Sequence, residues 1–453
     1  MPSKRRTPNL RRLFRKLSLR SHQGYVSKLF QLPVELLEEI LCHLEPASLK
    51  SVSLVSREFH SVAVPFLLRA VTLDFARGFR FMRSIEGNPS LAKHVQSITL
   101  HDHHMDSLEY QVKYAAWTKR LESVIGTCEK LRNLTIKASN IRDALNGTAF
   151  SNDRDMRALA DKEELFQTYF VPILQLSSLA NLQSCELNLS DGTGWKLAQR
   201  ECIFFHPRLK RLSILGAIIP DLISFTKSHE YTSPLEELSL MCCDISPKAL
   251  VKISSVPKAL RRFTYNASPH QRMCGSGVNT SMQHKLYLDA LKPQAPSLVY
   301  LNVSFWKRKV MNNPVMNFQY FSSLESLTIQ PAILQGNHED FSNHIPFTSN
   351  PLPTSLRHLT LFDVRLMFLP SLEANYVSSL GQWMTEGSLP NFTRLTFANP
   401  EEAAKVPAPQ VPPELEEAFL GKVVERVEFI KHRRFPMDCD CCEYNMGSLE
   451  MRF

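Results

Sequence analysis

Two groups of metal-ligating residues are close enough in sequence to support chemistry. Residues 101–104 read His-Asp-His-His, and Cys439, Cys441 and Cys442 lie near the C-terminus with His432 close by. Imidazole and thiolate groups bind zinc, but structural zinc sites usually combine two separated ligand pairs with a clear fourth ligand. Adjacent histidines in a loop are typical of solvated side chains. We therefore assign no metal site, no cofactor and no catalytic residue, and a metal held by the cysteines stays an open alternative.

Motifs that would indicate an enzyme are absent from the sequence. Gly275-Ser276-Gly277 lacks the following lysine and the strand-to-helix setting of a phosphate-binding loop. Neither the G-x-S-x-G pattern of a serine nucleophile nor the H-E-x-x-H pattern of a zinc protease occurs. We expect a protein without catalytic activity. The alternative from another class, a metal-dependent enzyme on an α/β scaffold, rests on the two clusters alone.

The net charge of +9 is concentrated at the N-terminus. Residues 1–34 contain nine lysines and arginines and no acid, and removing these nine from 53 basic residues leaves 44 against 44 acidic ones. The body is neutral, so its charge does not indicate nucleic-acid binding. Residues 1–28 form a basic leader with Leu10, Leu13, Phe14 and Leu17 at helical spacing. A weakly ordered tail, a nuclear-import or partner-binding signal and a membrane-surface or organelle-targeting helix all stay open for it.

The sequence also indicates in which cellular compartment the protein is expected. No stretch reaches the roughly 18 to 20 apolar residues needed to cross a bilayer, and the N-terminus lacks the apolar core of a secretory signal. We expect an intracellular protein of the nucleus, the cytoplasm or both. In that reducing setting its ten cysteines are expected to be free thiols rather than a disulfide framework.

A repeating apolar pattern indicates the secondary-structure elements that would position such residues. The pattern L-x-x-L-x-Φ, where Φ is apolar, recurs with first positions at Val95, Leu131, Leu182, Leu209, Leu235, Leu260, Leu298, Leu324, Leu356 and Phe392. Consecutive copies from 182 to 260 are 27, 26 and 25 residues apart, within the period of leucine-rich repeats. Longer gaps fit inserts at 140–178, 267–284 and 335–355, and a degenerate eleventh copy begins at Val424.

The residue between the second and third apolar positions of each copy is mostly small and polar: Thr99, Thr135, Glu186, Ser213, Ser239, Thr264, Asn302, Thr328, Thr360 and Thr396. A parallel sheet with one face in water would produce such a column. We therefore predict an α/β fold in which residues 70–400 form a leucine-rich-repeat-like solenoid. A Pro-rich spacer and a C-terminal segment follow at 401–453. Larger outward side chains on the same face are the predicted target-binding residues: Arg211, Arg262, Tyr300, His358 and Arg394.

A dense helical block precedes the repeats at residues 29–69. Apolar residues recur at helical spacing behind Pro33, a second helix can open at Pro46, and Ser56 is a plausible N-cap for a third. Three short helices in about 40 residues bury little surface, so such a unit usually needs a partner to complete its core. The block is therefore expected to dock on something.

This block resembles the F-box, especially that of fungal proteins. Residues 32–41 read Leu-Pro-Val-Glu-Leu-Leu-Glu-Glu-Ile-Leu, followed by Leu-Glu-Pro at 44–46 and Leu-Val-Ser-Arg at 54–57. Phe59 stands where many F-boxes have tryptophan. The resemblance covers about a tenth of the chain and implies contact with a Skp-type adaptor through Leu32, Pro33, Leu36, Ile40, Leu44, Leu54 and Val55.

The resemblance also implies a function. An F-box protein of this kind would be the substrate-recognition subunit of a Skp-cullin-F-box (SCF) ubiquitin ligase, linked to a cullin scaffold through the adaptor. The repeat array would then hold an unidentified protein target. An alternative of the same class is a scaffold that uses the adaptor contact without ubiquitin transfer.

Overall fold

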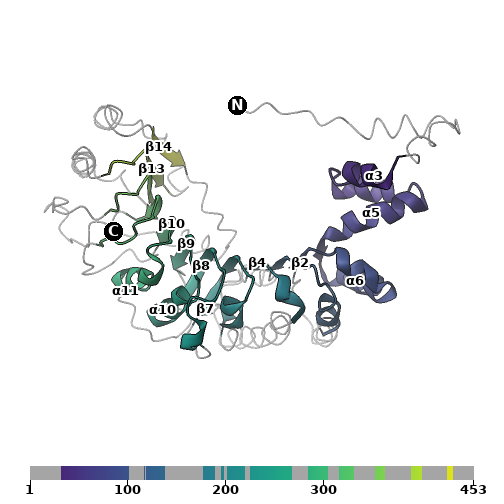
Figure 1. The fold of residues 1–453 in the computed structure, drawn as a ribbon, viewed down its shortest axis with the longest axis horizontal. Helices are drawn as coiled ribbons and strands as arrows, with labels where there is room; N and C mark the ends of the chain where they lie inside the picture. Colours follow the sequence, from purple (N-terminus) through teal and green to yellow (C-terminus); the bar gives the residue numbers. More distant parts are fainter. Residues whose placement is uncertain are drawn as a thin grey trace, which may run out of the picture. The chain divides into compact units, whose positions relative to one another are not determined.

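The computed structural model describes residues 32–101, 117, 119–137, 177–188, 195–197, 201–219, 225–267, 284–304, 316–330, 352–362, 389–399 and 426–431. The basic leader, the Pro-rich stretch, the cysteine cluster and nearly all of the three expected inserts lie outside these residues. The chain divides into two compact units. One comprises residues up to Val71 with His94–Gln96, and the other comprises Thr72–Lys93 and the chain from Ser97. Figure 1 colours the described residues by their place in the sequence, from purple for α3 to yellow for β14.

The first unit consists of three helices whose ends follow from local sequence. Helix α3 spans Val34–Leu41, α4 spans Pro46–Ser53 and α5 spans Arg57–Arg69. Pro33 is the N-cap of α3, and Pro46 is the first residue of α4, where the missing N–H of proline costs nothing. The Ser56 hydroxyl accepts a hydrogen bond of 3.2 Å from the Phe59 amide and so caps α5, as the sequence predicted.

A small apolar core holds these helices together. It contains Leu37, Leu41, Leu49, Val52, Phe59 and Ala63. A core of this size leaves much of the apolar surface of the helices uncovered, because a short chain has little interior to offer. Helices α3 and α4 both pack on α5.

The rest of the chain alternates strands with helices and turns. In chain order the elements are β1 (Ala70–Leu73), α6 (Phe75–Gly87), η1 (Pro89–His94), β2 (Ser97–His101), β3 (Asn133–Lys137), η2 (Ser177–Asn181), β4 (Ser184–Asn188), β5 (Trp195–Lys196), η3 (Glu201–Phe205), β6 (Arg211–Leu215), β7 (Ala217–Ile219), η4 (Lys227–His229), β8 (Glu237–Ile245), α10 (Pro247–Ser255), β9 (Arg262–Ala267), α11 (His284–Asp289), η5 (Lys292–Gln294), β10 (Tyr300–Ser304), β11 (Ser326–Ile329), β12 (His358–Phe362), β13 (Arg394–Asn399) and β14 (Arg426–Lys431).

The strands form an open sheet in which neighbours in space are neighbours in sequence. The order is β1-β2-β3-β4-β6-β8-β9-β10-β11-β12-β13-β14; off this path, short β7 pairs with β8, and β5 pairs with β7. Every described pair from β2 onward is parallel. Between successive strands, the carbonyl of the residue before one strand accepts hydrogen bonds from two amides at the start of the next. For β6 and β8, Lys210 O accepts bonds of 2.8 and 2.9 Å from the amides of Glu236 and Glu237. Repeating this link builds the sheet strand by strand.

The repeating apolar positions of the sequence are the core of this unit. All their described members are at most 2% exposed, and the second-position residues Leu212, Leu238, Phe263, Leu301 and Leu327 are aligned in register across successive strands. Because strand side chains alternate between the two faces, the residue between two buried positions points to the opposite face. The predicted pattern of parallel strands with helices, an α/β fold, is confirmed.

Two expectations about this sheet need correction. The polar column is partly exposed from β2 to β9, but Asn302 at 5%, Thr328 at 8% and Thr396 at 5% are buried rather than solvated. Asn302 lies beside the taller Tyr300, to whose hydroxyl its side-chain amide donates at 3.5 Å, and a short side chain is shielded by tall neighbours. In addition, β14 pairs with β13, so the sheet continues past the boundary expected at residue 400.

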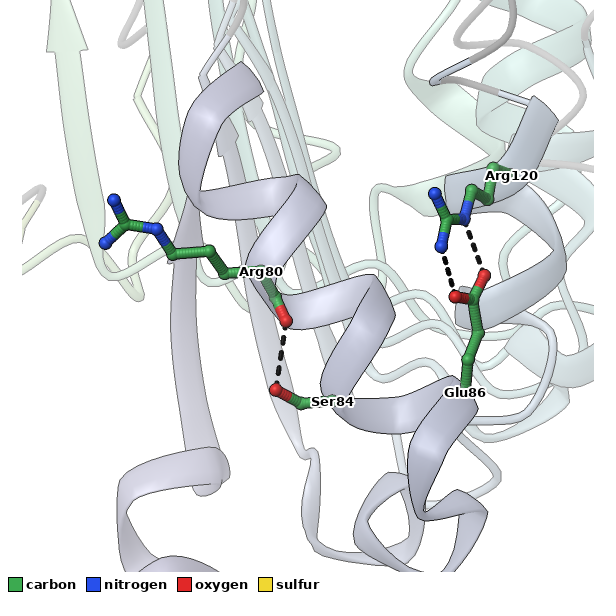
Figure 2. Close-up of polar contacts among 4 residues, drawn as sticks. All are labelled: Arg80, Ser84, Glu86 and Arg120. Atoms are coloured by element: carbon green, nitrogen blue, oxygen red, sulfur yellow. Dashed lines mark hydrogen bonds and ion pairs between the residues drawn. The ribbon is translucent and has the colours of Figure 1, made fainter.

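Helix α6 is fixed to the helical residues 119–125 by an ion pair. Figure 2 shows Glu86 facing Arg120, whose Nε donates to Oε1 at 2.6 Å while Nη2 contacts Oε2. In the same view the Ser84 hydroxyl donates to the Arg80 carbonyl at 2.9 Å within the helix. Gly78 on α6 lets the Trp117 ring approach the helix closely, because a Cβ at position 78 would lie 2.7 Å from Trp117 Nε1. No described helix is long and apolar enough to cross a membrane.

Candidate functional site

The three-helix unit displays a group of large apolar side chains to solvent. Val34, Leu36, Ile40, Leu54 and Val55 are exposed, Leu54 to 78% and Val55 to 57%. We call these five residues the exposed apolar face. Scattered apolar residues are normal on a protein surface, whereas five within 22 residues of one small unit indicate a docking surface.

Helix and turn geometry place these side chains. Leu36 and Ile40 are four residues apart on α3 and therefore stand on one side of the helix, one turn from exposed Pro33. Leu54 and Val55 form the turn between α4 and α5. Their amides donate to the carbonyls of the preceding turn at 3.3 and 3.0 Å, and the capped start of α5 follows at once. The most exposed pair is therefore held on an ordered turn.

Two of the predicted adaptor contacts lie elsewhere. Leu32 and Leu44 are half-buried and pack against the core of their own unit. Their own domain thus covers part of these two side chains, and adaptor contact through them stays a prediction. Pro33, Leu36, Ile40, Leu54 and Val55 are exposed. Sequence reasoning missed Val34, which shares a helical face with buried Leu37 but lies at the open end of that face.

The side chains around the exposed apolar face are suited to binding a partner. Glu35, Glu38 and Glu39 are exposed on α3 next to the apolar residues. Glu58, in the first turn of α5, has a lowered pKa because the Ser56 side chain hydrogen-bonds to it. Within the described residues no group of three His, Cys, Asp or Glu side chains could hold a metal. An apolar centre with a carboxylate border can bind a partner of complementary shape and charge.

Comparison with known proteins agrees with this geometry. Residues 29–74 match the F-box-like family model, a span that contains α3, α4 and α5. A search of curated proteins finds no match for the chain. The N-terminal unit is therefore an F-box-like domain. Domains of this kind bind Skp-type adaptors and typically occur in non-catalytic subunits of ubiquitin ligases.

A second candidate surface lies on the sheet. The predicted target-binding residues are the first residues of their strands: Arg211 on β6, Arg262 on β9, Tyr300 on β10, His358 on β12 and Arg394 on β13. Register aligns them in one row, which passes through Glu237 on β8 and Ser326 on β11. We call this row the strand-start row. The structure thus brings together side chains that lie up to 183 positions apart in the sequence.

The strand-start row exposes basic side chains to solvent. Arg211, Arg262 and His358 are exposed, while Tyr300 and Arg394 are half-buried. The Arg262 guanidinium stacks over the Tyr300 ring at 4.4 Å from its centre, which fixes the orientation of both side chains. Arg211 and His358 make no ion pair with the described residues. The exposed guanidinium groups of Arg211 and Arg262 are suited to binding carboxylates or phosphates of a partner.

Three buried cysteines of the sheet unit are not suited to nucleophilic catalysis. Burial raises the pKa of Cys128 to about 11 and that of Cys185 and Cys243 to about 12. The thiolate is the reactive form of cysteine, so these side chains are inert at neutral pH. Cys243 is fully buried in β8, where the register with β9 shifts.

Proposed function

We propose that this chain is the substrate-recognition subunit of an SCF-type ubiquitin ligase. The F-box-like domain docks on a Skp-type adaptor, and the adaptor links it to a cullin scaffold. The observation that carries this proposal is the exposed apolar face, which lies within the F-box-like match and has no cover in the chain itself among the described residues. A monomer gains nothing from leaving these side chains in water, whereas a partner would bury them.

The sheet unit then holds the target. Its strands follow one another at the repeat spacing of the sequence, and we assign it to the leucine-rich-repeat-like solenoids, which bind partners through an extended face. The strand-start row is the proposed contact, with Arg211, Arg262, Tyr300, His358 and Arg394 as its residues. Tyrosine and arginine are enriched among the residues that dominate binding energy, and the exposed guanidinium groups of Arg211 and Arg262 favour an acidic segment of the target.

In this proposal the chain itself catalyses nothing. It raises the concentration of the target's lysines near a conjugating enzyme, which is a tethering effect. We place it in the nucleus, the cytoplasm or both. The second candidate is a scaffold that binds the adaptor without ubiquitin transfer, which the exposed apolar face would serve equally well.

A pull-down with purified Skp-type adaptor tests the docking surface. The variant Leu54→Asp with Val55→Asp should lose binding, because two carboxylates would be placed in an apolar contact. The matched control is Leu286→Asp with Val251→Asp, which changes the same residue types at exposed positions of the sheet unit. Equal binding by wild type and the Leu54/Val55 variant would overturn the assignment.

A reconstituted ubiquitin-transfer assay separates the receptor from the scaffold. With adaptor, cullin, activating and conjugating enzymes present, a receptor should support ubiquitin transfer to proteins captured through the strand-start row. A scaffold should bind the adaptor with the same affinity and leave captured proteins unmodified. The adaptor pull-down does not distinguish the two, so both measurements are needed.

A further inference from the structure

A third surface lies on the side of the sheet unit that carries the connections between strands. Four successive connections, from the one before β8 to the one before β11, each expose one large apolar side chain: Tyr231, Val251, Leu286 and Tyr320. Parallel strands placed in chain order have connections that return on the same side of the sheet. The four side chains therefore belong to one side of this unit, where Figure 1 places α10 next to α11.

Hydrogen bonds make these connections one continuous layer. The Tyr231 amide donates to Ser255 O at 2.9 Å, at the end of α10. The Ser254 hydroxyl donates to Ala290 O just after α11, and the buried Gln294 amide donates to Ser254 O at 2.8 Å. Lys292 then lies over the Tyr320 ring at 5.2 Å from its centre. Each of the four connections thus contacts the next.

The two helices turn opposite faces to the sheet and to solvent. On α10 the residues Ala249, Leu250 and Ile253 are buried, while Val251 is 47% exposed. On α11 Tyr287 and Leu288 are buried, while Leu286 is 46% exposed. The core side of each helix is therefore formed by other residues, and Val251 and Leu286 lie on the solvent side.

The cations of this layer differ from those of the strand face. The described residues of these four connections, 225–236, 246–261, 284–299 and 316–325, contain a single arginine, Arg261, and six lysines: Lys227, Lys248, Lys252, Lys258, Lys285 and Lys292. Their acids are Glu230, Glu236, Asp289 and Glu325; Asp289 is paired with Lys292 at 2.8 Å and Glu236 with Lys210 at 3.1 Å. The layer is therefore positive, with its apolar side chains standing among lysines. We call Tyr231, Val251, Leu286, Tyr320 and these six lysines the lysine-apolar layer.

The excess of lysine over arginine in these connections favours one of two kinds of partner. Protein interfaces are enriched in arginine and depleted in lysine, because lysine is strongly hydrated and makes less directional contacts. A membrane surface attracts clustered lysines through its diffuse negative potential and needs no directional pairing. Tyrosine is favoured at the level of lipid headgroups, and aliphatic side chains between such residues can enter the acyl boundary.

We propose that the lysine-apolar layer is a contact surface for membranes that contain anionic phospholipids. Val251 and Leu286 enter the bilayer boundary, Tyr231 and Tyr320 lie at headgroup level, and the lysines are attracted to the anionic headgroups. The strand-start row lies on the opposite face of the sheet, so this contact leaves the proposed target-binding side chains accessible. The inference does not depend on adaptor binding or ubiquitin transfer.

Vesicle co-sedimentation of the full-length chain tests the proposal. Vesicles of phosphatidylcholine alone are compared with vesicles that also contain phosphatidylserine. Wild type should bind the second kind more strongly, and Val251→Asp with Leu286→Asp should reduce that binding at least about tenfold. A second variant, Lys248→Glu with Lys285→Glu, changes only exposed side chains and should give a similar loss without risk to the core.

The control variant is Leu54→Asp with Val55→Asp, which should bind vesicles like wild type. The basic leader is kept in every protein, so any contribution from it is common to all of them. The proposal is overturned if wild type ignores phosphatidylserine, or if both layer variants bind as wild type does, which would assign the binding to the leader. It is equally overturned if the variants keep vesicle binding but lose a protein from pull-downs, which would make the layer a protein interface.

Discussion

The F-box-like domain and the sheet unit treat their apolar residues in opposite ways. The domain leaves Val34, Leu36, Ile40, Leu54 and Val55 in solvent around a small core, while the sheet buries its repeating apolar positions to 2% exposure or less. A parallel array completes its own core with each added strand, whereas three short helices cannot. Exposed apolar residues thus dominate the proposed contact of the domain, whereas the strand-start row of the sheet unit presents mainly polar and charged side chains.

Phe263→Ala should give the largest effect and should be confined to the sheet unit. Phe263 is 1% exposed and pairs in register with Leu238 on β8 and Leu301 on β10. Removing a buried ring leaves a cavity and costs about 3 to 5 kcal/mol of unfolding free energy. Chemical denaturation followed by circular dichroism measures the loss. Adaptor binding should be unchanged, and a variant that loses it would show that the two units are energetically coupled.

Leu54→Ala with Val55→Ala should have the reverse profile. Both side chains are exposed, so their removal should leave the denaturation midpoint of the chain unchanged. Burying such a side chain against a partner is worth about 1.5 to 3 kcal/mol, so adaptor affinity should fall by about one to two orders of magnitude. Isothermal titration with purified adaptor measures it. A fall in stability without a fall in affinity would mean that the turn serves the fold rather than docking.

Leu32→Ala and Pro33→Ala should differ in their effects on stability and on adaptor binding, although the sequence assigned both residues to adaptor contact. Leu32 is half-buried against the core of the domain, so its truncation should lower the stability of the domain by about 1 to 2 kcal/mol. Pro33 is exposed at the N-cap of α3, where alanine still permits a helix start, so its replacement should act on binding more than on stability. Thermal melts and adaptor titrations of the two single variants check this. Equal melting temperatures would support adaptor contact through Leu32.

How much of this could be read from the sequence depended on periodicity. The repeat predicted the parallel strands, their buried positions and the row that gathers Arg211, Arg262 and Tyr300, because a fixed period fixes the register. The starts of α4 at Pro46 and of α5 after Ser56 were also predicted, and helical spacing predicted the helix behind Pro33. It could not separate Leu32 from Leu36, because both are apolar in one short segment and only the packing of α3 on α5 decides which is covered. Val251 and Leu286 were missed for the same reason, since they fall within helices whose remaining apolar residues are buried.

Arg262→Ala with Tyr300→Ala should have the smallest effect on stability and still change function. An exposed cation over a ring is worth about 0.5 to 1 kcal/mol, so the unfolding free energy should fall by no more than this plus a small packing loss. The matched control is Lys210→Ala, which removes an exposed ion pair with Glu236 of 3.1 Å and should also cost less than about 1 kcal/mol.

Target capture should distinguish the two variants. Affinity purification with mass spectrometry should show about tenfold less captured target for the Arg262/Tyr300 variant and no change for Lys210→Ala, because arginine and tyrosine dominate binding while an exposed, already paired lysine does not. Adaptor recovery serves as the internal standard, since the F-box-like domain is untouched in both. If both variants capture the same proteins as wild type while adaptor recovery is normal, the strand-start row is not the target site and its cations serve only solubility.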